Sequence, residues 1–153
     1  MGSQMSISDL MISEDNYKKK TGPLVFFWRI KQAIMDAQLS RQELHNLAMN
    51  IVGKDLEGQG YEFLGINSDI KKNPQFVALR DKLLHFVIVR AVAYPNEPQV
   101  YDAAFMETIT THAKNFEAKV FYAGVGLGHG TDYALPPIKN EPYTQLYRGL
   151  QEL

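Results

Sequence analysis

The residues with the types and spacing best suited to chemistry lie in one stretch, residues 120–135, which read VFYAGVGLGHGTDYAL. Because glycine has no Cβ, alternating glycines let a backbone approach a ligand closely and group its N–H donors around an anion. Four glycines alternate in this stretch, at positions Gly124, Gly126, Gly128 and Gly130. Beside them stand four side chains suited to contacting a ligand, His129, Thr131, Asp132 and Tyr133. We therefore predict that residues 124–131 form a loop that is the candidate ligand site.

His129 and Thr131 are the two residues of this stretch to which we assign catalytic roles. The imidazole would act as an acid or base, while the Thr131 hydroxyl and the glycine N–H groups hold a phosphate. The four glycines, Asp132 and Tyr133 are then predicted to bind the ligand. The spacing differs from the dinucleotide and P-loop motifs, and the prolines at 136–137 leave room for at most one helical turn. A glycine-rich turn packed against aromatic side chains therefore stays open as the alternative.

The composition limits which classes of function fit the chain. Its 153 residues are 45% hydrophobic and 22% charged, which is ordinary for one globular domain. The absence of cysteine excludes thiol catalysis and cysteine-bound metals. The 16 basic and 17 acidic residues give a net charge of −1, so the basic field of a typical nucleic-acid-binding protein is missing. We expect no metal, no cofactor and no nucleic-acid partner.

The hydrophobic residues also bear on location. No apolar run approaches the roughly 20 residues that a helix needs to cross a bilayer. The sequence shows no basic start followed by an apolar core, as a signal peptide would have. We expect a cytoplasmic protein that has no membrane partner.

The periodicity of apolar residues predicts a mostly helical fold. Residues 23–37, with the aromatic segment LVFFW assigned to the core, show helical spacing. We predict further helices over residues 40–53, 74–93, 99–114 and 143–150, with a short strand or turn near 61–66. The helix over 74–93 is apolar almost all round, which is typical of a central, buried element. The predicted fold class is α+β but predominantly α: a compact, single-domain helical bundle around this central helix, with a small strand element near residues 118–126.

The second predicted helix begins with a clear N-terminal motif. Ser40 and Glu43 have the spacing of a capping box, in which each side chain accepts from the other residue's backbone N–H. The segment from Arg29 to Ala48 resembles the first two helices of a phage-repressor helix-turn-helix. No basic third helix that would read a DNA groove follows it. An αα-hairpin is therefore the favoured interpretation.

Two hypotheses for function stay open. We predict a loosely packed N-terminal arm over residues 1–22, with residues 1–4 as a possible expression scar, and one globular domain over residues 23–153. Because no catalytic set is complete, the favoured function is a soluble protein-interaction module, such as an adaptor, inhibitor, immunity or effector-type protein, with a protein partner or a second copy of itself. The alternative is a small enzyme or binding domain for a phosphate-bearing ligand, a nucleotide or phosphodiester, that uses residues 124–131 and His129.

Overall fold

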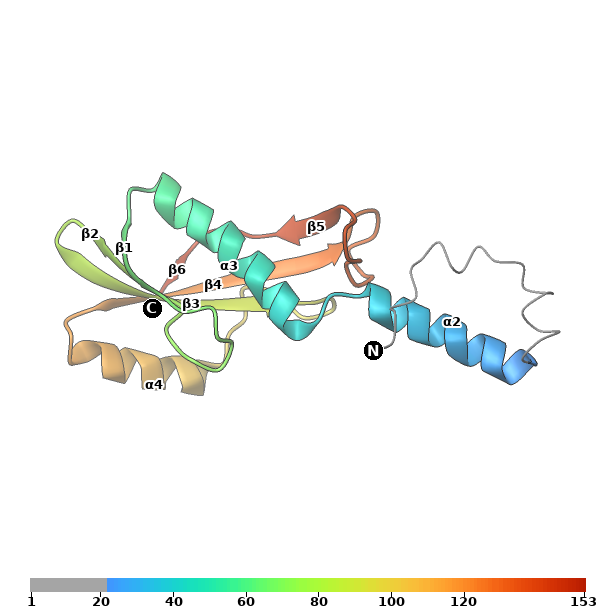
Figure 1. The fold of residues 1–153 in the computed structure, drawn as a ribbon. Coiled ribbons are helices and arrows are strands. Elements are labelled where there is room, and N and C mark those ends of the chain that lie inside the picture. The colour runs from blue at the N-terminus through green and yellow to red at the C-terminus, as the bar shows by residue number, and fades with distance from the viewer. Residues whose placement is uncertain (1–21) are drawn as a thin grey trace.

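The computed structural model describes residues 22–153, and the predicted arm over residues 1–22 lies almost wholly outside them. A six-stranded mixed sheet forms the body, with one helix on each face and a further helix projecting from one end (Figure 1). Helix and strand account for 34% and 30% of these residues. The predicted helical bundle around a central helix is therefore wrong, because the sheet is the central layer.

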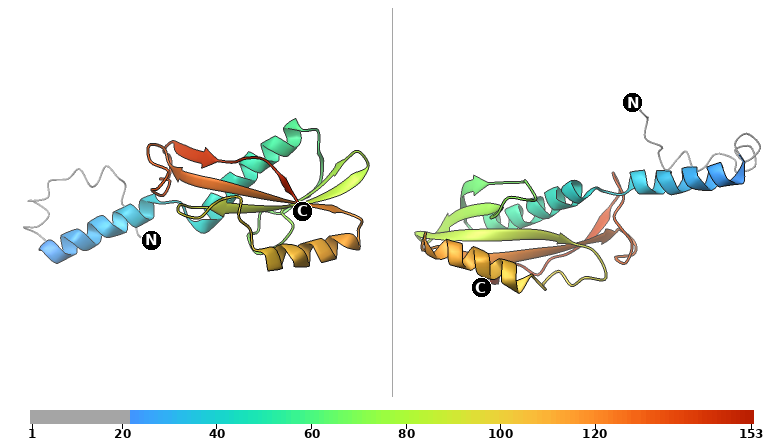
Figure 2. Two further views of the ribbon diagram at one scale, coloured as in Figure 1. Left: turned by 180° about the vertical axis from the view of Figure 1, so that it is seen from behind. Right: turned by 90° about the horizontal axis from the view of Figure 1, so that it is seen from below.

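The projecting helix is α2 (Pro23–Ala37), and the next helix is α3 (Arg41–Gly58). The capping box at the start of α3 is confirmed. Glu43 N–H donates to the Ser40 hydroxyl at 3.1 Å, and Ser40 N–H donates to the Glu43 carboxylate at 3.0 Å. The helix continues five residues beyond the predicted end at Gly53. α2 points away from α3 and the sheet (Figures 1 and 2), so the predicted αα-hairpin does not form.

The chain after α3 forms a meander of three antiparallel strands: β1 (Glu62–Ile66), β2 (Phe76–Arg80) and β3 (Leu83–Val92). Of the two alternatives for residues 61–66, a short strand or a helical turn, the chain forms the strand β1. α3 is therefore followed by a strand and not by a recognition helix. The predicted helix 74–93 is wrong, because its residues form β2 and β3. The turn between them places Asp81 and Lys82 at positive φ.

The second half of the chain completes a parallel crossover. α4 (Ala103–Lys114) starts after Asp102, whose carboxylate accepts from Phe105 N–H at 3.1 Å. β4 (Lys119–His129) then runs parallel to β3 in the middle of the sheet. The predicted strand element near 118–126 is thus real, but it is longer and central. β5 (Tyr143–Leu146) and β6 (Gln151–Glu152) both pair with β4 in an antiparallel direction, so the predicted helix 143–150 is wrong.

Two apolar clusters hold the layers together. The larger one lies between α3 and the sheet, where Val52 and Leu56 pack with Val87, Val89 and Val125. The smaller one lies between α4 and the opposite face, and the right panel of Figure 2 shows the two helices on opposite sides. Neighbouring residues of a strand point to opposite faces. Each central strand therefore contributes alternate side chains to the two clusters.

Candidate functional site

The predicted glycine-rich loop is a buried, paired strand, so the loop prediction is wrong. Gly124 pairs with Arg90 of β3, while Gly126 and Gly128 pair with Leu146 and Thr144 of β5. Backbone groups of a paired strand are taken up by its ladder. The concave arrangement of free N–H donors that a phosphate loop needs is therefore not formed along this stretch.

Close packing against one face of β4 explains why glycine occupies alternate positions of this strand. Gly124, Gly126 and Gly128 share one face of β4, and the chain passes directly over that face. A Cβ at Gly126 would meet the Tyr133 hydroxyl and would lie 2.8 Å from Pro98 Cγ. A Cβ at Gly128 would lie 2.5 Å from the Tyr133 carbonyl oxygen. This arrangement agrees with the alternative of a glycine segment packed against an aromatic side chain.

His129 and Thr131 lie together at the end of β4. The Thr131 backbone N–H donates to His129 Nδ1 at 3.2 Å, and the Thr131 hydroxyl lies 3.0 Å from the same nitrogen. Nδ1 is therefore an acceptor, and in the neutral ring the proton is on Nε2. Below the pair, the Thr144 hydroxyl donates to the His129 carbonyl at 2.9 Å. The pair thus presents one N–H donor outward, and its catalytic role stays a prediction.

The other predicted ligand residues have local structural roles. The Asp132 carboxylate accepts from Ala134 N–H at 3.0 Å and so closes a turn. Tyr133 packs over the glycine face, and its hydroxyl is buried without a hydrogen-bond partner among the described residues. Burial raises the pKa of this phenol. Gly130 is exposed just beyond the strand. Ligand binding by these residues stays a prediction.

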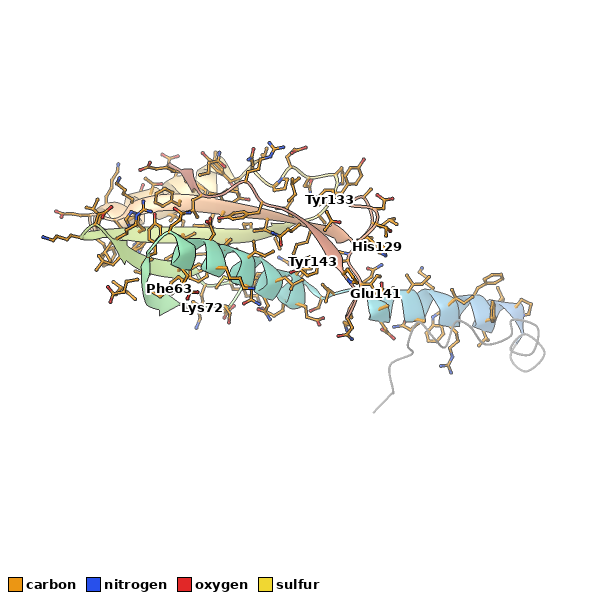
Figure 3. All side chains as sticks on the ribbon, turned by 90° about the horizontal axis from the view of Figure 1, so that it is seen from above. Phe63, Lys72, His129, Tyr133, Glu141 and Tyr143 are labelled. Atoms are coloured by element: carbon orange, nitrogen blue, oxygen red, sulfur yellow. The ribbon has the colours of Figure 1, made fainter. Side chains whose placement is uncertain are left out.

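His129 lies at the same end of the body as the base of α2 (Figure 3). Lys139 N–H donates to the Ala37 carbonyl at 2.8 Å, and Gln38 forms an isolated bridge with Ile138. Between α3 and the segment 138–143 lies a groove of about 370 Å³. Glu43 lines this groove, and its carboxylate lies 3.7 Å from Lys139 Nζ. Within residues 22–153, these contacts join the C-terminal end of α2 to the body.

α2 carries the exposed apolar surface that sequence reasoning placed in the core. Leu24 is 85% exposed, Trp28 60% and Met35 57%, and their spacing puts them on one face of the helix. Ile34 and Val25 are also exposed by 44% or more. The periodicity correctly predicted an apolar helix. Periodicity alone does not show whether a chain's own body covers such a helix.

Two classes of site find no support in the structure. Residues 22–153 contain no cluster of three or more histidine, aspartate or glutamate side chains placed to hold a metal ion. In the same residues, no helix combines the length and the hydrophobicity that crossing a bilayer requires.

Comparison with known proteins places the body, but not α2, in a family. Residues 42–153 match the model of a family described as "Domain of unknown function (DUF8840)". The match begins in the first turn of α3 and runs to the last residue. No curated protein matches the chain.

Proposed function

We propose that this chain, which belongs to the DUF8840 family, is a protein-interaction module that assembles with a second copy of itself through α2. The observation that carries the proposal is the exposed stripe of Leu24, Trp28 and Met35 on a helix that projects from the family domain (Figure 1). A helix that is apolar over most of its circumference belongs in a buried environment. Large exposed apolar patches mark interaction surfaces.

A second copy of the chain offers an apolar-lined groove on its body that could receive α2. A groove of about 470 Å³ runs between α3 and the edge strand β1. Its apolar lining includes Met49, Phe63, Ile66 and Phe76. Ile66 is 61% exposed there, and Leu64 on the same strand is 53% exposed. One chain thus carries both an exposed apolar stripe on a helix and a groove with an apolar lining, which are the two halves of a helix-in-groove contact.

Length and charge are compatible with this pairing. α2, with 15 residues, is about 22 Å long, which is shorter than the 18-residue α3 that forms one wall of the groove. The groove is also lined by Lys54 and Glu57. α2 carries Asp36 and Arg29, so each groove charge has a possible partner of opposite sign. Reciprocal exchange of α2 between two copies would close the assembly at a dimer.

The test measures association of the full chain by sedimentation velocity. We expect wild-type protein to dimerise, and Trp28→Gln to raise the dissociation constant at least about tenfold, a loss of about 1.4 kcal/mol. Trp28 is the chain's single tryptophan, so wild-type emission should shift to the blue as concentration rises. Val100→Gln is the matched control, because Val100 is 73% exposed on the body and should leave association unchanged.

A complementation experiment separates helix-in-groove packing from simple pairing of two α2 helices. Trp28→Gln damages the helix, and Ile66→Lys damages the groove. A mixture of the two variants retains one intact contact, made by the helix of the Ile66→Lys chain in the groove of the Trp28→Gln chain. We expect heterodimers in the mixture at concentrations where each variant alone is monomeric. A monomeric wild type, or an Ile66→Lys chain that dimerises normally, would contradict the proposal.

A further inference from the structure

A second cleft, unrelated to α2, lies on the α4 side of the sheet where the parallel strands β3 and β4 are joined by their crossover. Its volume is about 600 Å³. Its walls are the carboxyl end of β3, the segment 95–102, the first turn of α4, and Tyr122 of β4. In open α/β sheets, ligands bind in crevices at the carboxyl ends of parallel strands. A cleft at this position is therefore a candidate ligand site.

Arg90 is the cation of this cleft, and it has no anionic partner within residues 22–153. Its Nη1 donates to the Val89 carbonyl at 2.9 Å and lies 3.5 Å from Gln75 Oε1, and its Nη2 donates to Asn73 Oδ1 at 3.1 Å. All three acceptors are neutral, and the ion pairs among residues 22–153 involve other side chains. Burial lowers the pKa of Arg90, as expected for a cation without a counter-ion.

The hydrogen bonds of Arg90 leave donors free. A guanidinium has five N–H groups, and the described contacts use three of them. The guanidinium is also held over the Phe105 ring, with Cζ 5.1 Å from the ring centroid. A partly buried charge is costly unless an anion pairs with it. A preorganised guanidinium with two free donors is suited to binding a carboxylate.

The residues that line the cleft around Arg90 determine which kind of ligand would fit beside its guanidinium. Tyr101 and Tyr122 line the cleft with their ring centroids 5.2 Å apart, and neither hydroxyl has a hydrogen-bond partner among the described residues. Such rings pack against an aromatic or apolar body. Glu97 and Asp102 also line the cleft, and their carboxylates repel a dianion more strongly than a monoanion. These features favour a ligand with one negative charge over a dianionic phosphate.

We propose that the Arg90 cleft binds a small aromatic carboxylate, with the carboxylate on the free guanidinium donors and the ring against Tyr101 and Tyr122. The site is separate from the α2 stripe and from His129, so it does not depend on either.

The test titrates benzoate into the full chain and follows backbone amides by NMR. We expect saturable shifts confined to residues 88–106 and 122, and binding of the neutral analogue benzamide at least about tenfold weaker. Arg90→Gln should weaken benzoate binding at least about tenfold. Arg80→Gln is the matched control, because Arg80 also stacks on an aromatic ring, 4.3 Å from the Tyr61 centroid, but lies outside the cleft.

A second variant keeps the proposal testable if Arg90→Gln fails to fold. Ala93 is exposed and lines the cleft, so Ala93→Trp would fill its mouth without touching the Arg90 hydrogen bonds. We expect this variant to keep the wild-type melting temperature and to lose benzoate binding. Absence of wild-type binding up to about 20 mM benzoate, well above a millimolar dissociation constant, would overturn the proposal. Equal binding of benzamide, or tighter binding of phenyl phosphate, would overturn it too.

Discussion

The hydroxyl of Tyr147 donates a 2.5 Å hydrogen bond to Asp55 Oδ2, joining the segment after β5 to α3 across 92 residues of sequence. Tyr147 also packs against the larger apolar cluster. Burial, with the hydrogen bond to Asp55 and the charge of that carboxylate, raises the pKa of Tyr147. The bond thus fastens the C-terminal end of the chain to the layer that covers the sheet.

We predict that Tyr147→Phe lowers the free energy of unfolding by about 1.5 to 3 kcal/mol, the contribution of a hydrogen bond to a charged group. Urea denaturation at pH 7 measures this change. Tyr143→Phe is the control, since Tyr143 is partly exposed and its hydroxyl has no hydrogen bond within residues 22–153. An equal loss in both variants would show that the Asp55 bond contributes nothing specific.

The same bond has a pH dependence. The pKa of Tyr147 is higher in the folded state than the ordinary value of 10.0, so the unfolded state releases its proton first. The contribution of the Tyr147 phenol to the free energy of unfolding is therefore complete below pH 10 and is lost as the pH rises above it. The difference in stability between wild type and Tyr147→Phe should shrink above pH 10, and a difference that grows there would contradict this assignment.

The glycines of β4 yield a steric prediction. Gly126→Ala should lower the free energy of unfolding by about 1 to 3 kcal/mol, because the added methyl group meets the Tyr133 hydroxyl and Pro98. Gly58→Ala is the control, since Gly58 ends α3 with no atom within 4 Å of an added Cβ. Thermal unfolding compares the two variants, and equal melting temperatures would refute the packing argument.

A double-mutant cycle locates the clash. Tyr133→Phe alone should be neutral or slightly stabilising, because it removes a buried hydroxyl that has no hydrogen-bond partner among the described residues. In the Gly126→Ala background it also removes the nearest clashing atom. The double variant should therefore recover part of the lost stability, with a coupling energy of at least about 0.5 kcal/mol. Strict additivity would place the cost of Gly126→Ala elsewhere.

Local signals in the sequence were reliable where local physics decides the structure. Ser40 and Glu43 fix the start of α3 through bonds three residues apart. Asp102 caps α4 through the same kind of bond, but the predicted helix over residues 99–114 began before it. Val87 to Val89 form an apolar run that is as typical of a buried strand as of a buried helix. Their β-branched side chains favour the strand. The strand is buried because it pairs with β4, and this pairing joins residues more than 30 positions apart, which a local pattern does not show.

The prediction of a glycine-rich loop was wrong for the same reason. Alternating glycines at 124–128 indicate only that other groups can come close to the backbone, because glycine has no Cβ. What approaches it is set by the fold, and here Pro98 and Tyr133 fill the space. Arg90 gave no signal, because neither its missing counter-ion nor the aromatic cleft around it can be deduced before β3, α4 and β4 are placed together. Exposure of Trp28 was equally unreadable from helical spacing.

His45 supplies the last prediction, on acid stability. His45 belongs to α3 and is buried, with 2% of its surface exposed, and its Nε2 has no hydrogen-bond partner among the described residues. Burial first, and then the charge of Arg90, lowers the pKa of His45 below its ordinary value of 6.5. The unfolded chain therefore binds a proton that the folded chain resists, and stability is lost as the pH falls below 6.5, by up to about 1.4 kcal/mol per pH unit.

The test compares the free energy of unfolding of wild type with that of His45→Leu. A comparison is needed because burial also lowers the pKa of His85, so that His85 makes stability depend on pH in the same direction. His45→Leu keeps an apolar group of similar size in the site and removes the titration. Urea denaturation from pH 8 to pH 5 should show wild type losing stability faster than His45→Leu below pH 6.5. Parallel curves would mean that the His45 imidazole is protonated in the folded protein, where its Nε2–H would need an acceptor that the surrounding α3 and sheet side chains do not offer.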